Sequence, residues 1–262
     1  MQKNIKTRTS QASIPRSAGF TLTEVLVVIV IIAVLAAVLV PTVTSMKDRA
    51  SAAGCASNMR QCTAMAIMFT TEQGGRLPRL HVYNGQMNQI GKTALPVEER
   101  IVNNGPANFW PDQLTTYAEG ASMFCCPKLT KSAVKGPGGG VSKRIPLGIG
   151  INYYRLADNT GKDDGIGYNW PMLMNVPEPS RIVWFADAAG DVKGSWKDRV
   201  EVPGTGSCFF RGATNDGQGV MPRHGGKINV AFVDGHVALV NPSEIDWGSR
   251  DTGKSYVGFG HF

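Results

Sequence analysis

The stretch that decides the fold is residues 19–46, GFTLTEVLVVIVIIAVLAAVLVPTVTSM. Its last 22 residues, Val25–Met46, contain no charged side chain, and as far as Val40 they are apolar on every side of a helix. At 1.5 Å per residue they span about 33 Å, enough to cross the ~30 Å hydrocarbon core of a bilayer. Because no polar face interrupts the run, a membrane-spanning helix is favoured over a buried core helix.

The charge pattern around this run predicts its topology. The leader ahead of it carries four basic residues and no acid, namely Lys3, Lys6, Arg8 and Arg16. Basic flanks stay in the cytoplasm, so we expect a single pass through the inner membrane with the remainder exported. The segment Pro41–Ser45 is a poor signal-peptidase site, and Gly19, before the run, is the better cleavage point. Residues 1–19 are therefore expected to be a cleaved leader.

Overall charge does not predict nucleic-acid binding. The chain has 27 basic and 20 acidic residues, and four of the basic ones lie in the leader. The exported part is therefore only slightly basic. One loop, residues 128–144, is basic and glycine-rich. Such a loop can bind a polyanion or can simply be solvated.

Beyond the apolar run the pattern becomes amphipathic. Apolar residues recur at spacings of three and four, at Ala52, Cys55, Met59, Cys62, Ala66 and Phe69. This spacing predicts one continuous helix from about residue 21 to residue 71, kinked near Pro41 and ended by Gly74 and Gly75. The membrane part is expected at about 22–46, and the apolar stripe of the second part is expected to pack on a partner.

Residues 73–262 are expected to form an exported globular head. Strands are predicted at 148–154 and 181–186, with a short helix at Trp110. The clearest element is a hairpin over 227–241, in which Asp234 and Gly235 suit a two-residue turn. That turn pairs Phe232 with Val237 and puts one apolar face toward the helix stripe, made of Ile228, Val230, Phe232, Val237 and Leu239. The predicted fold class is α+β, a long helix packed on an antiparallel sheet.

The segment Gly19–Glu24, between a basic leader and an apolar helix, resembles the type IV prepilin signal. This signal is shared by type IV pilins and by the pseudopilins of type II secretion systems. The resemblance implies that a prepilin peptidase cuts after Gly19 and methylates the new amino terminus at Phe20. It also implies a type IV pilin-like fold, in which residues 20–72 form the pilin helix and Pro41 matches a common mid-helix proline.

A second resemblance lies near the C-terminus. His224, followed after nine residues by Asp234 and Gly235, resembles the prepilin-type processing-associated H-X9-DG domain, here at 224–241. The segments 55–61 and 124–127 resemble the helix motif and the Cys-Pro motif of the same proteins.

Glu24 lies at the start of a membrane span, where a carboxylate is costly. After cleavage it would lie about one helical turn from the ammonium of Phe20, in the same or a neighbouring subunit. At 4 Å and an effective dielectric near 20 the pair gains about 4 kcal/mol. The insertion penalty for one mid-membrane charge is about 2.5–3.5 kcal/mol. Glu24 is therefore predicted to act in subunit assembly.

The five cysteines leave two interpretations open. Cys55 either packs as a small buried residue or forms a disulfide with Cys125 or Cys126 that ties the head to the helix. A cysteine-based metal site is not expected, because the sequence contains no Cys-x-x-Cys pair. Asp187 and Asp191 follow a strand, as do carboxylates in pseudopilin calcium sites, and are the candidate calcium ligands.

His224, Asp234 and His236 are close in sequence and allow either a structural hairpin or a metal site. A prepilin-anchored hydrolase built on His224 and Asp234 is the enzymatic alternative. The sequence contains no serine nucleophile elbow, phosphate loop or paired catalytic carboxylates, so no enzyme is expected.

The resemblance therefore implies a structural subunit of a type IV pilus-like or type II secretion pseudopilus filament. Its expected partners are prepilin peptidase, the inner membrane and other pilin or pseudopilin subunits. After assembly it would lie in a periplasmic or cell-surface filament. The alternative is a minor pilin that binds DNA or a glycan through its head.

Overall fold

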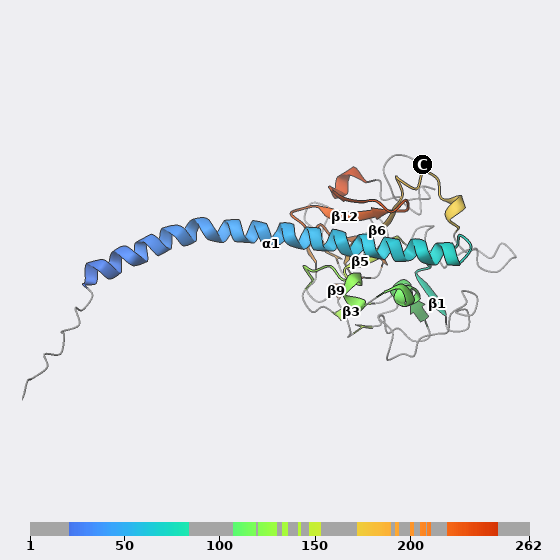
Figure 1. Cartoon of the computed structure of the whole chain (residues 1–262), viewed down its shortest axis with the longest axis horizontal. Coiled ribbons are helices and arrows are strands. Elements are labelled where there is room, and N and C mark those ends of the chain that lie inside the picture. The colour runs from blue at the N-terminus through green and yellow to red at the C-terminus, as the bar shows by residue number, and fades with distance from the viewer. Residues whose placement is uncertain are drawn as a thin grey trace, which may run out of the picture. The chain divides into compact units, whose positions relative to one another are not determined.

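The computed structural model describes residues 21–83, 107–118, 120–129, 133–135, 141–142, 147–152, 172–189, 192–193, 200–201, 205–207, 209–210 and 219–245. The chain divides into two compact units, Met1–Ser45 and Met46–Phe262. Helix α1, Leu22–Glu72, begins in the first unit, contains Pro41, and ends in the second (Figure 1).

The end of α1 confirms the prediction that glycines stop the helix. Gly74 and Gly75 adopt positive φ angles of 64° and 90°, which a residue with a Cβ adopts only at a cost. The Gly75 N–H donates to the Thr70 carbonyl at 2.8 Å, so a carbonyl of the last turn is satisfied.

The stripe on the second part of α1 is buried largely as the spacing predicts. Cys55, Met59, Cys62, Ala66 and Phe69 are fully buried. The burial also extends to three residues outside the predicted stripe, Thr63, Met65 and Thr70. The two threonines donate to backbone carbonyls one turn earlier, which satisfies their hydroxyls inside the core.

Thirteen strands are found in the described part of the head. They are β1 His81–Tyr83, β2 Ala107–Phe109, β3 Ala133–Lys135, β4 Val141–Ser142, β5 Ile149–Asn152, β6 Val183–Ala189, β7 Val192–Lys193, β8 Val200–Glu201, β9 Thr205–Gly206, β10 Phe209–Phe210, β11 Gly219–Val220, β12 Ile228–Phe232 and β13 Val237–Val240. The short helix predicted at Trp110 is α2, Trp110–Leu114, and short 3₁₀ helices follow at Thr115–Tyr117, Ala121–Phe124, Leu173–Asn175 and Pro242–Glu244.

Strand β6 is the centre of the largest sheet. It pairs antiparallel with β5, β9, β11 and β12. Parallel pairs occur between β5 and β10 and between β3 and β9, so the sheet is mainly, but not wholly, antiparallel. In Figure 1 the second part of α1 lies across β12, β6 and β5. The predicted α+β, pilin-like arrangement of a long helix on a sheet is confirmed.

The hairpin β12–β13 exists, but its predicted register is wrong by one residue. Ala231 pairs with Val237, and the turn has three residues between Phe232 and His236. A two-residue turn of the expected type needs positive φ at both central positions. Here Gly235 has a φ of 100°, whereas Asp234 is not among the described residues with positive φ. The glycine alone takes the left-handed conformation, which favours the longer turn.

The face of the hairpin predicted to contact the helix is correct only for Val237, which packs against the core that contains the α1 stripe, whereas Leu239 is 44% exposed. The core that contains the α1 stripe includes Ala231 and Val233 of the hairpin. Ile228, Val230 and Phe232 instead pack in a second core with Val183 and Ala186 of β6. Every residue of β12 is buried. Alternation of polarity therefore gave no information about which face meets the helix.

Candidate functional site

The start of α1 is a capping box formed by Thr21 and Glu24. The backbone N–H and the hydroxyl of Thr21 each donate to Glu24 Oε2 at 2.8 Å. The Glu24 N–H lies 3.3 Å from Thr21 Oγ1 in return. These reciprocal bonds satisfy backbone donors that a helix start leaves unpaired. Glu24 thus has a local structural partner that the sequence analysis did not identify.

The apolar first part of α1 exposes its side chains. Val27, Leu35 and Leu39 are each 57–59% exposed. The most apolar stretch of α1 has no buried residue, and the helix is long and apolar enough to cross a membrane. A continuous exposed apolar surface of this kind is normally covered by lipid or by another protein.

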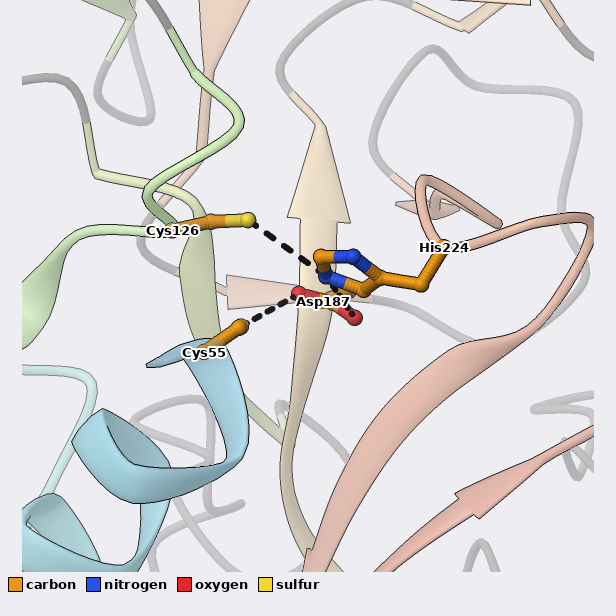
Figure 2. Close-up of side chains that lie close together, drawn as sticks. All are labelled: Cys55, Cys126, Asp187 and His224. Atoms are coloured by element: carbon orange, nitrogen blue, oxygen red, sulfur yellow. Dashed lines mark hydrogen bonds and ion pairs between the residues drawn. The ribbon is translucent and has the colours of Figure 1, made fainter. Parts of the chain in front are cut away.

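A second site lies inside the head, where four side chains from four separate segments meet (Figure 2). Cys55 comes from α1, Asp187 from the central strand β6, and Cys126 and His224 from segments that precede β5 and β12. One ligand atom from each lies within 4.8 Å of every other, and all four residues are buried. We call this set the Cys-Cys-Asp-His cluster.

The distances inside the cluster are short enough for direct interaction. Cys55 Sγ donates to Asp187 Oδ1 at 3.0 Å. His224 Nε2 lies 3.4 Å from Asp187 Oδ2 and 3.6 Å from Cys126 Sγ. In Figure 2 the imidazole ring points between the carboxylate and the Cys126 thiol.

Cys126 is positioned by close packing of its backbone. The neighbouring Cys125 pairs with Leu147 in an isolated antiparallel β-bridge of the backbone. The Cys125 carbonyl accepts a hydrogen bond from Asn58 Nδ2 of α1 at 2.8 Å. Gly148 lies directly against Cys126, since a Cβ added there would be 2.7 Å from Cys126 Cβ. A glycine is therefore required for the two segments to approach this closely.

Asp187 and His224 are held by their own surroundings. Asp187 Oδ2 accepts the Asn229 N–H at 2.7 Å, and Asn229 Nδ2 continues to the Ala52 carbonyl of α1 at 3.2 Å. His224 begins a tight turn that ends in reciprocal bonds with Lys227 at 3.1 and 3.2 Å. Gly225 and Gly226 inside the turn have positive φ angles of 63° and 79°. These contacts hold Asp187 and His224 in place within the cluster.

The surroundings shift the ionisation of the cluster. A hydrogen bond with Cys55, supported by His224 and the Arg223 guanidinium, lowers the pKa of Cys126 to about 6 although burial opposes this. The hydrogen bond with Cys126, burial and the Asp187 charge raise the pKa of Cys55. Burial disfavours protonated His224, but Asp187 and Cys126 raise its pKa to about 9. A thiolate is thus favoured at Cys126, and thiolates are ligands of soft and borderline metal ions.

The predicted site residues are divided between this cluster and other places. Gly19, Phe20 and Asp191 lie outside the described residues, as do residues 153–171. Asp187 and His224 are in the cluster, whereas Asp234 and His236 form an exposed pair with Nδ1 and Oδ1 2.6 Å apart. The sequence proximity of His224 to Asp234 therefore does not correspond to a common site.

The cysteines predicted to form a disulfide are free thiols in the structure. Cys55 and Cys126 are neighbours in the cluster, while Cys125 Sγ faces the Ala121 carbonyl at 3.9 Å. A bridge between Cys55 and Cys126 remains a prediction. Cys208 lies outside the described residues.

Most of the basic loop 128–144 also lies outside the described residues. Its first cation, Lys128, donates to Asp48 at 2.8 Å and to the Arg223 carbonyl at 2.6 Å. This lysine joins the loop that precedes β12 to α1, and its charge is already paired.

The cluster could not be predicted from short spacings between ligand residues, because its members are far apart in the sequence. The set combines residues separated by up to 169 positions, from Cys55 to His224. One signal was available, since Asp187 interrupts the apolar run 182–188 of a buried strand. A buried carboxylate requires a partner, and that partner was worth seeking among the cysteines and histidines.

Comparison with known proteins supports the N-terminal interpretation. Residues 14–40 match the sequence family described as the prokaryotic N-terminal methylation motif. This range includes the end of the leader and the first part of α1. No curated protein and no solved structure matches the chain. The motif indicates a pilin-like prepilin that prepilin peptidase processes, with a membrane-anchoring helix, and such motifs are typical of structural subunits.

Proposed function

We propose that this chain is a structural subunit of a type IV pilus-like or type II secretion pseudopilus filament. Prepilin peptidase would cleave it after Gly19 and methylate Phe20. The observation that carries the proposal is the methylation motif at 14–40, which runs directly into an apolar helix with exposed side chains.

The exposed apolar surface supports assembly through the helix. Before assembly the bilayer covers the first part of α1, and after extraction from the bilayer this surface needs an equally apolar environment. The same segment of neighbouring subunits supplies that environment. The head then remains on the outside of the bundle of helices.

Glu24 has two candidate roles in this proposal, and they can be separated. Its carboxylate caps α1 through Thr21 in the single chain. In a filament the carboxylate would pair with the ammonium of Phe20. This ion pair gains about 4 kcal/mol of Coulomb energy at 4 Å and an effective dielectric near 20. Glutamine preserves the capping hydrogen bond but removes the charge.

The first experiment is intact-mass measurement of the chain from cells with and without prepilin peptidase. We expect the mature chain to begin at N-methylated Phe20 only when the peptidase is present. A chain that retains residues 1–19 in peptidase-positive cells would refute the processing step.

The second experiment compares subunit crosslinking in membranes carrying Glu24→Gln, Glu24→Ala or Thr21→Val, with cleavage checked by mass. Both Glu24 variants should lose crosslinked oligomers, and Thr21→Val should keep them. If Glu24→Gln assembles like the unmodified chain and Glu24→Ala does not, capping explains the residue. Unchanged assembly in all three would remove the charge-pairing argument.

A further inference from the structure

We propose that the Cys-Cys-Asp-His cluster in the head binds one zinc ion. Cys55, Cys126 and His224 would each supply one ligand atom, and Asp187 one carboxylate oxygen. This inference is independent of the proposed filament function, because all four residues lie in the unit Met46–Phe262.

Two separations in the cluster match the edges of a tetrahedron around zinc, and the four ligand atoms all lie within 4.8 Å of one another. Zinc lies about 2.3 Å from sulfur, 2.0–2.1 Å from nitrogen and 2.0–2.2 Å from oxygen, so its tetrahedral edges are about 3.6 Å (sulfur to nitrogen) and about 3.4 Å (nitrogen to oxygen). The observed values are 3.6 Å for Cys126 Sγ to His224 Nε2 and 3.4 Å for His224 Nε2 to Asp187 Oδ2. The contact of Cys55 with the other carboxylate oxygen is shorter, at 3.0 Å.

Hydrogen bonding alone explains these positions less well. A charge-assisted bond from imidazolium to carboxylate has a length of about 2.7–2.9 Å, and the Nε2 to Oδ2 distance of 3.4 Å is clearly longer. A cation between the four groups would satisfy Nε2 and both thiolates at once.

The donor set favours zinc over the calcium ion predicted from the sequence. Calcium takes six to eight oxygen ligands, whereas this cluster offers two sulfurs, one nitrogen and one carboxylate. Two thiolates, one imidazole and one carboxylate suit a borderline-soft, four-coordinate ion. With all four positions occupied by protein and the site buried, the ion would be structural, with no open position for a substrate.

The charges around the site also balance. Two thiolates, one carboxylate and a dipositive ion leave one negative charge. The buried Arg223 guanidinium supplies the compensating positive charge, and it is fixed by bonds to the carbonyls of Gly148 and Ala188. Binding would displace the thiol protons to solvent.

The ion would add a direct link between α1, β6 and the two segments that hold Cys126 and His224, which hydrogen bonds and packing already bring together. It would also keep Cys55 and Cys126 from oxidising after export. A disulfide between the same two residues is the competing state, and it excludes the metal because it consumes both thiolates.

The test uses the full chain, purified in detergent without chelators and analysed for metals by mass spectrometry. We expect about one zinc per chain, falling at least tenfold in Cys55→Ala and in Asp187→Asn. The matched control is Cys62→Ala, since Cys62 is another fully buried thiol on α1 and lies outside the cluster. This control should retain its zinc.

A second measurement uses the unmodified chain, so its result does not depend on whether a variant folds. The unmodified chain is stripped with a chelator under reducing conditions and titrated with Co²⁺, which should give the sulfur-to-metal charge-transfer bands of a tetrahedral thiolate site. Absence of these bands, or a zinc-free chain whose mass is lower by two hydrogens with Cys55 linked to Cys126, would overturn the proposal.

Discussion

The close approach of Gly148 to Cys126 makes the most direct prediction about the head. In Gly148→Ala the new Cβ would lie 2.2 Å from Leu129 Cδ1, 2.7 Å from Cys126 Cβ and 3.2 Å from Cys126 N. The leucine tip can rotate away, but the cysteine contacts involve the main chain and the first side-chain carbon. Cys126 must therefore move by several tenths of an ångström or more.

Overpacking of this kind costs about 1–3 kcal/mol, which for a domain of this size lowers Tm by about 2–12 °C. The assay is thermal and denaturant unfolding of the full chain in detergent, followed by the fluorescence of the buried Trp110 and Trp184. If the zinc proposal is correct, the same substitution should also weaken zinc binding, because it displaces one ligand.

The control for this experiment is Gly120→Ala. A Cβ at Gly120 would meet nothing within 4 Å, and its φ of 179° is ordinary extended backbone. This variant should unfold within about 0.5 kcal/mol of the unmodified chain. If Gly148→Ala also leaves the free energy of unfolding within about 0.5 kcal/mol of the unmodified chain, Gly148 does not position Cys126.

Two further predictions concern the packing and the ionisation of the head. Phe69→Ala should destabilise the head by about 3–5 kcal/mol, because a fully buried ring is lost. Its control is Met68→Ala, which should cost less than about 0.5 kcal/mol because the Met68 side chain is 51% exposed. Similar unfolding midpoints for the two variants would contradict the assignment of Phe69 to the buried stripe. Burial and the nearby Arg79 lower the pKa of His81 to about 4, whereas in the unfolded chain it is about 6.5. The unfolded state then binds more protons between these values, so the stability that His81 contributes is present above pH 6.5 and is lost as pH falls toward 4. His81→Gln should lose less stability than the unmodified chain between pH 7 and pH 5, and parallel pH profiles would contradict this.

Local patterns in the sequence predicted the elements that depend on neighbouring residues. The apolar run after Glu24 and the stripe from Cys55 to Phe69 predicted α1 to within a residue at either end. The two glycines at 74 and 75 predicted its end, since only positive φ was required there. The hairpin was located by its Asp-Gly turn for the same reason.

The errors arose where the outcome depended on distant parts of the chain. The register of β12 against β13 differed by one position from the prediction, in a turn whose Asp234 N–H donates to the carbonyl of the distant Pro179. The face of the hairpin that meets α1 could not be read from alternation, because both faces of β12 are buried. Ala231, rather than Val230, therefore packs in the core that contains the helix stripe.

The sequence by itself determined that a basic leader precedes an apolar helix, and residues 14–40 suffice for the methylation motif. These features are properties of contiguous residues, so no fold is needed to recognise them. Only the tertiary structure decided that Cys55, Cys126, Asp187 and His224 meet. Their positions depend on the pairing of β6 with its neighbours, on the packing of α1, and on a close approach that only a glycine at 148 allows. Each of these is a long-range contact, which no local periodicity encodes.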